Sequence, residues 1–317
     1  MKSLPRLTLA VFVLAAAGYW LTTTSLFGFQ EPAGKRPPAT PATKDSAKDS
    51  PKERSADAAG PESAEAKGAL DQARQRLLRY KSIKAKLVET VALSSRRFTV
   101  HGSYLQGSSA DLKLRLEFQV KLGDTEGSVL EVCDGQVVWS RHQIGDEPAR
   151  ITRRDVRQIL KAAADHGYTD NLVTVDLGFG GLPGLFASIE QSMQFDQFKA
   201  DTAEGQKLVV IEGGWKDHML KGWQGNNPKA QLPEYVPSRI RIYFDGESLF
   251  PRRILYLRRN PDQRLRPMVS LDFSEVETDI AIPAGKFKFV PPDGVFPDDL
   301  TPQFVKQIEQ RKKLGGQ

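Results

Sequence analysis

The chain has 317 residues, of which 39% are hydrophobic, so it can build a packed core in one large or two modest domains. Its formal net charge is +6, and Cys133 is its only cysteine, which excludes a disulfide within the chain. The four histidines show no metal-ligand spacing, and no P-loop, nucleophile elbow or histidine-centred catalytic motif occurs. The composition therefore argues against a disulfide scaffold, a bound metal or other cofactor, and an enzyme.

Residues 1–29 have the layout of a signal peptide or of an N-terminal signal anchor. Basic residues precede an apolar run from Leu7 to Leu21, and the alanines at 15–17 offer a small-residue cleavage site. The run can also be extended to Phe29, which makes it about long enough to span a bilayer. Both interpretations predict export to the periplasm or cell envelope, where the protein is either soluble or anchored to the inner membrane.

Residues 30–63 are predicted to be a disordered tether. They are mainly Pro, Ala, Lys, Ser and Asp, with almost no large apolar side chain, so burial could not offset the entropy lost on folding. A flexible coil of this length spans roughly 30 Å from end to end. If the N-terminus is an anchor, the tether would hold the following domain, residues 64–317, near the membrane.

Arginines are crowded in the C-terminal half of the chain. We interpret them as a solvated outer face and edge of a sheet, with attraction to anionic lipid headgroups as the alternative. No interleaved aromatic platform accompanies them, so nucleic acid is not a predicted partner. The residues are Arg239, Arg241, Arg252, Arg253, Arg258, Arg259, Arg264 and Arg266.

The domain begins with helical spacing from Ala64 to Tyr80 and continues as a series of strands. The clearest strand is Asp111–Leu122, where apolar residues alternate strictly with polar ones, as in an antiparallel sheet with one wet face. A sheet this long must curl or be covered. The same alternation occurs at 97–105, 128–133, 136–144, 207–213, 239–244, 253–257 and 269–273.

Two helical stretches interrupt the strands. The first is Thr152–Ala164, with Thr152 as its cap, and the second is the apolar stretch Gly184–Phe195, preceded by a glycine-rich hinge at 178–181. The predicted fold is mainly β with helices (α+β). It is an incomplete, strongly bent antiparallel β-barrel whose helices cover its concave apolar face.

Two short motifs within this pattern indicate a family. The hairpin Leu130–Trp139 (LEVCDGQVVW) has an Asp-Gly turn. In the run Lys286–Val295 (KFKFVPPDGV), Phe287 and Phe289 alternate with lysines, which predicts a half-buried strand ended by two prolines. With the N-terminal helix, and in this order, these motifs resemble the periplasmic outer-membrane lipoprotein carriers, LolA, LolB and their relatives, over roughly Ala64 to Glu309.

The resemblance implies that the concave face holds the acyl chains of lipids or lipoproteins. The candidate lining residues take the apolar positions of alternating pairs or match the family hairpin: Leu114, Leu116, Phe118, Leu130, Val132, Trp139, Ile242, Phe244 and Phe273. The second helical stretch is a candidate lid over the mouth, through Leu182, Leu185, Phe186 and Ile189.

Alternation does not distinguish an open cavity from a filled core, nor a mobile lid from a fixed plug. Two functions are therefore predicted. The first is a carrier-like chaperone that binds lipid or lipoprotein acyl chains. The second is a non-transporting envelope sensing or protein-interaction module of the same fold.

Overall fold

The computed structural model describes residues 58–315, except for 94–95, 123–124, 168–179, 204, 225–226, 228–229, 231, 234 and 261. The predicted signal segment and most of the predicted tether thus lie outside the described residues. Within the described ranges, no helix is both long and apolar enough to cross a membrane. The described fold begins at Ala58, slightly before the domain boundary that the composition indicates.

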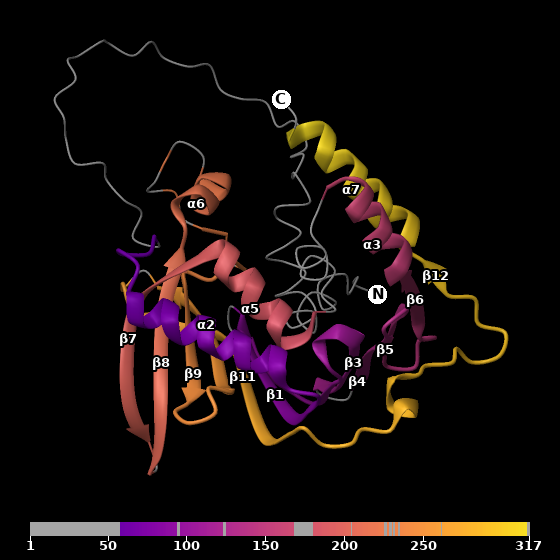
Figure 1. Ribbon diagram of the computed structural model, residues 1–317, viewed down its shortest axis with the longest axis horizontal. Helices are drawn as coiled ribbons and strands as arrows, with labels where there is room; N and C mark the ends of the chain where they lie inside the picture. The colour runs from indigo at the N-terminus through magenta and orange to yellow at the C-terminus, as the bar shows by residue number, and fades with distance from the viewer. Residues whose placement is uncertain are drawn as a thin grey trace.

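In the described part of the chain, twelve strands form one curled sheet (Figure 1). The order is β12-β6-β5-β4-β3-β2-β1-β11-β10-β9-β8-β7, and only β12 runs parallel to its neighbour. Strands β7 and β12 are the two edges, so the predicted incomplete antiparallel barrel is confirmed. The strands are β1 Ile83–Leu93, β2 Arg96–Gln106, β3 Lys113–Leu122, β4 Thr125–Asp134, β5 Val137–Ile144, β6 Arg150–Asp155, β7 Met193–Ala203, β8 Gln206–Trp215, β9 Arg239–Asp245, β10 Pro251–Arg259, β11 Leu265–Thr278 and β12 Asp298–Asp299.

Helices cover the concave side of this sheet in two groups (Figure 1). Helix α2, Ala64–Arg79, packs against α5, Gly181–Ser192, and both contact β7. At the other end, α3, Val156–Asp165, packs against α7, Thr301–Gly315, with α3 on β5 and α7 on β6. Helix α6, Asp217–Gln224, follows β8.

The sequence of α2 explains its placement. Ser63 caps its N-terminus, because its Oγ accepts a hydrogen bond from the backbone N–H of Ala66 at 3.2 Å. Its buried residues recur every three or four positions and so form one stripe that faces the core. These residues are Ala66, Ala69, Leu70, Ala73 and Leu77.

Both predicted mid-chain helices have different boundaries in the structure. Residues 150–155 form β6, and α3 begins only at Val156, capped by Asp155 and not by Thr152. The Asp155 carboxylate accepts a hydrogen bond from the N–H of Gln158 at 2.9 Å and so caps the helix. Thr152 cannot be the cap, because it is paired with Ser140 of β5 in the sheet. Helix α5 begins at Gly181 and ends at Ser192. The next residues start β7, where Met193 is opposed to Trp215 and Phe195 to Gly213 of β8, so they belong to the sheet and not to the helix.

The run after Pro283 also differs from the strand that was predicted there. The structure forms the 3₁₀ turn η3, Ala284–Phe287, where alternation predicts a strand. The carbonyl of Pro283 accepts a hydrogen bond from the N–H of Lys286 at 2.9 Å, which closes the turn. A short motif of alternating aromatic and basic residues can thus serve as cover for a sheet without joining it.

Candidate functional site

Cross-strand pairing determines which side chains share the concave face, because directly opposed residues point to the same side. Leu116 of β3 is opposed to Tyr104 of β2, and Leu87 of β1 is opposed to Phe273 of β11. The same side continues across β10 to Ile242 of β9. We call this continuous face the concave wall. Of the predicted lining residues, those that lie on it, buried in one core cluster, are Leu114, Leu116, Phe118, Ile242, Phe244 and Phe273.

Leu130, Val132 and Trp139 lie on the opposite, outer face, so their predicted placement was wrong. Val132 is opposed to Arg115 and to Trp139, and Leu130 is opposed to Glu117, which puts all three on the charged side of β3. Strand β4 carries apolar residues on both faces, so its alternation has no unique phase. A one-residue error in phase moves every side chain to the other face.

The C-terminal motif covers these outer residues. The ring of Phe289 lies 5.7 Å from that of Trp139, Phe287 is buried, and the Arg115 guanidinium donates to the carbonyl of Lys286 at 3.1 Å. The two motifs that indicate the family therefore meet in space, on the outer face of the β4–β5 hairpin. Their packing explains how the C-terminal segment crosses the sheet towards β12 and α7.

The predicted lid residues lie on α5 and cover the concave wall. Leu182, Phe186 and Ile189 are buried in the core, and Leu185 is partly buried against it. The Phe186 ring packs edge-on against that of Phe244 of β9 at 5.7 Å. In this conformation α5 therefore lies against the wall. Of the glycine hinge expected at 178–181, residues 178 and 179 lie outside the described part, whereas Gly180 and Gly181 form the start of α5.

The N-terminus of α5 is tied to the wall by a buried hydroxyl. The Leu182 N–H donates to the Tyr104 hydroxyl at 2.9 Å, and that hydroxyl in turn donates to the side-chain carbonyl of Gln106. Burial raises the pKa of Tyr104 well above its usual range. A Cβ at Gly181 would collide with both side chains, and its φ is +58°, so this contact requires glycine.

Two further polar side chains lie on the wall and have no hydrogen-bond partner among the described residues. Glu89 is opposed to Val100 of β2 and Leu271 of β11, and it is only 1% exposed. Burial raises its pKa to about 8. Tyr256 of β10 is 3% exposed, and the Oε1 of Glu89 and the hydroxyl of Tyr256 are both buried and unpaired. This pair was not among the predicted site residues, although a glutamate in the apolar phase of residues 83–91 is a detectable signal.

A second polar group closes the far end of the wall. Ser140 donates to a carboxylate oxygen of Glu131 at 3.0 Å, and the Arg154 guanidinium reaches the same oxygen at 3.5 Å. Arg154 also lies over the Phe304 ring of α7, 5.6 Å from its centroid. Burial lowers the pKa of the neighbouring His142. These side chains pair with one another, so the cluster joins β4, β5 and β6 to α7.

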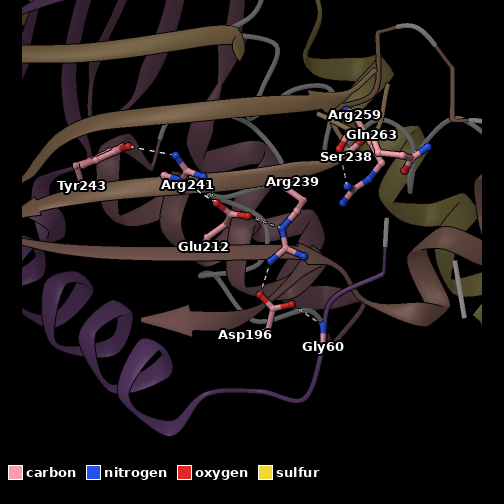
Figure 2. Close-up of polar contacts among 9 residues, drawn as sticks. All are labelled: Gly60, Asp196, Glu212, Ser238, Arg239, Arg241, Tyr243, Arg259 and Gln263. Atoms are coloured by element: carbon pink, nitrogen blue, oxygen red, sulfur yellow. Dashed lines mark hydrogen bonds and ion pairs between the residues drawn. The ribbon is translucent and has the colours of Figure 1, made fainter. Parts of the chain in front are cut away.

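Arg239 of β9 is buried, which corrects the interpretation of that residue as solvated, whereas Arg241 beside it is partly exposed. Figure 2 shows Arg239 between Glu212 and Asp196, with Arg241 on the second oxygen of Glu212. Arg239 donates to Glu212 at 2.7 Å, and its side chain is only 7% exposed. The Gly60 N–H donates to Asp196 at 2.5 Å, so the network also holds the segment that leads into α2. This cluster is structural, because both arginines form ion pairs with carboxylates on β7 and β8.

No protein-family model and no curated protein matches the sequence. Among solved structures, the chain is similar to the crystal structure of MucB, with 16% identity over 73% of this chain and 65% of that chain and a TM-score of 0.39. It is also similar to LprF from Mycobacterium bovis, with 15% identity over 71% and 98% and a TM-score of 0.35. A LolA superfamily protein from Nitrosomonas europaea matches at 10% identity over 71% and 97%, with a TM-score of 0.28.

The chain spans less than two thirds of the MucB chains that it matches, including 62% of that in the Pseudomonas aeruginosa MucA/MucB complex. At sequence identities of 10–16% and TM-scores below 0.5, these similarities concern the fold and not the function of this chain.

Proposed function

We propose that this protein is a carrier-like chaperone of the cell envelope that binds lipid or lipoprotein acyl chains on its concave wall. The observation that carries the proposal is the continuity of that wall. Apolar side chains extend from Leu114 of β3 to Phe244 of β9 on one face, beneath a helix with a buried apolar stripe. The proposal includes no chemical step.

Helix α5 is the element that an acyl chain would displace. Its apolar side chains touch the wall, and an acyl chain would offer the wall the same kind of contact, at roughly 0.8 kcal/mol per buried methylene. The polar link at its N-terminus is the Leu182–Tyr104 hydrogen bond. Its C-terminus passes directly into β7 at Met193, so the helix could turn about that end while staying attached to the sheet.

The proposal is tested by one substitution on each face of the β3–β4 pair. Leu116→Asp places a carboxylate on the wall, whereas the matched Leu130→Asp places one on the outer face. We expect uptake of a fluorescent fatty acid to be lost in the first variant and kept in the second. Equal uptake by both variants, with both folded, would contradict binding on the wall.

Leu116→Asp buries an unpaired charge and can also unfold the protein. A fatty acid with a photoreactive diazirine, applied to the unmodified protein, avoids this difficulty. Mass spectrometry should find the label on the strands that form the wall and on α5. Labelling confined to the outer face, or no uptake at all, would overturn the proposal.

The alternative is a sensing or protein-interaction module in which α5 is a permanent plug. The burial of Phe186 and Ile189, both 0% exposed, favours it, because a plug needs no ligand to complete the core. Lipid extraction from the purified protein separates the two functions. The alternative predicts no bound lipid and no uptake of an acyl probe by a correctly folded protein.

A further inference from the structure

We propose that Glu89 and Tyr256 form a polar subsite on the concave wall that hydrogen-bonds the carbonyl end of an acyl ester or acyl amide. This inference rests on the proposed acyl binding and assigns a position to the ligand's polar end. The two residues come from β1 and β10, which are separated in the sheet only by β11.

The register places both side chains on the same face. Glu89 is opposed to Leu271, and Tyr256 is opposed to Val269, two residues earlier on the same strand β11. The two side chains are thus diagonal neighbours across one strand. Charge on Glu89 raises the pKa of Tyr256 further, beyond the effect of burial, which puts them within electrostatic reach of each other.

Their surroundings give neither group a structural partner. The residues directly opposed to Glu89 are apolar on both sides, and its Oε1 and the Tyr256 hydroxyl are unpaired among the described residues. An unpaired buried polar group is costly, and an apolar side chain of similar size would avoid the cost. Tyr104 on the same wall differs, because its hydroxyl is used to hold α5. Among the described residues, the Tyr104 hydroxyl thus has a structural role, whereas Glu89 and Tyr256 keep hydrogen-bonding atoms that a ligand could use.

The protonation of the pair indicates the kind of ligand. With a pKa of about 8, the Glu89 carboxyl is mostly protonated at pH 7 and can donate its proton in a hydrogen bond. The Tyr256 hydroxyl is a second donor. Two donors suit a neutral acceptor such as the carbonyl of an ester or amide, whereas a long-chain amine would require the ionised carboxylate.

The test compares methyl laurate with dodecyl methyl ether, which has the same chain and lacks only the carbonyl oxygen. Each compound displaces a fluorescent fatty acid from the full chain at pH 7. We expect the wild type to bind the ester roughly three- to thirtyfold more tightly than the ether. Tyr256→Phe and Glu89→Met should each reduce this ratio by roughly two- to tenfold. Tyr243→Phe, on the outer face of β9, is the matched control and should leave the ratio unchanged.

The outcomes distinguish this inference from the function beneath it. Equal binding of ester and ether by the wild type would overturn the subsite and leave acyl binding intact. Failure of both compounds, and of the fatty acid itself, would overturn both. If dodecylamine bound more tightly than the ester, the subsite would prefer a cation to a carbonyl, and the assignment would be refuted. A purely structural pair would leave the ratio unchanged in Tyr256→Phe and Glu89→Met.

Discussion

The buried carboxyl of Glu89 predicts an unusual dependence of stability on pH. In the folded chain, burial raises its pKa from 4.5 to about 8, so the folded state keeps a proton that the unfolded state releases. Stability therefore falls as pH rises from about 4.5 to about 8, and this contribution is constant above that range. Glu89→Gln is neutral at every pH and should not show this loss.

The size of the effect follows from the same values. A shift of one pKa unit corresponds to about 1.4 kcal/mol. The shift from 4.5 to about 8 therefore lowers the free energy of unfolding by at most roughly 5 kcal/mol. That is a large fraction of the free energy of unfolding of a typical domain, about 5–15 kcal/mol. The titratable group that faces Glu89 across the wall is Tyr256, which stays neutral over this range because its own pKa is raised.

The assay is urea unfolding of wild type and Glu89→Gln at each pH from 5 to 9. The difference in free energy between the two proteins should grow in favour of the glutamine variant up to about pH 8 and then level off. Taking the difference cancels the contributions of other groups, such as Asp245 and Asp299, whose pKa values are lowered. Parallel curves, with a difference constant within about 0.5 kcal/mol, would show that Glu89 ionises normally in the folded protein.

Three other predictions concern stability. Gly181→Ala should lower the free energy of unfolding in urea by roughly 1–3 kcal/mol, because a side chain cannot fit at that position. Gly184→Ala has open space around it and should raise the free energy of unfolding by up to about 1 kcal/mol. Equal effects of the two substitutions would contradict the anchoring of α5. Arg239→Met removes a cation from two buried carboxylates and should lower the free energy of unfolding by roughly 3–5 kcal/mol. Arg253→Met removes an exposed cation and should lower it by less than about 1 kcal/mol. Phe287→Ala should cost roughly 3 kcal/mol and expose the C-terminal segment to limited proteolysis; unchanged cleavage would mean that the motif does not hold that segment.

Alternation predicted the concave wall correctly only where one phase was apolar and the other charged. In β3 the leucines and Phe118 alternate with lysine, arginine and glutamate, so the face follows directly from the sequence. In β4, Val129 and Cys133 lie on the wall while Leu130 and Val132 lie on the outer face. The η3 turn, with its buried Phe287, covers part of that outer face, and only the folded chain brings those segments together.

The polar residues of the site were harder to predict for a related reason. Glu89 breaks the apolar phase of its strand, which the sequence displays, but its partner Tyr256 lies far along the chain and reaches it through the order β1-β11-β10. The buried Arg239 was interpreted as solvated because a basic residue on the polar phase of a strand usually is. Its two carboxylate partners come from β7 and β8, and the sequence alone does not pair those strands.

The energetics of α5 connect the two proposed functions. Three of its buried side chains, Leu182, Phe186 and Ile189, cover the wall, and burial of such side chains is worth roughly 1.5–3 kcal/mol each, or about 5–9 kcal/mol together. An acyl chain of about ten methylenes buries a comparable amount, roughly 8 kcal/mol. Exchange of helix for ligand is therefore close to balanced, so small terms decide between a carrier and a plugged module. The hydrogen bond from Leu182 to Tyr104 favours the closed helix, and the unpaired Glu89 and Tyr256 favour a ligand that brings a carbonyl.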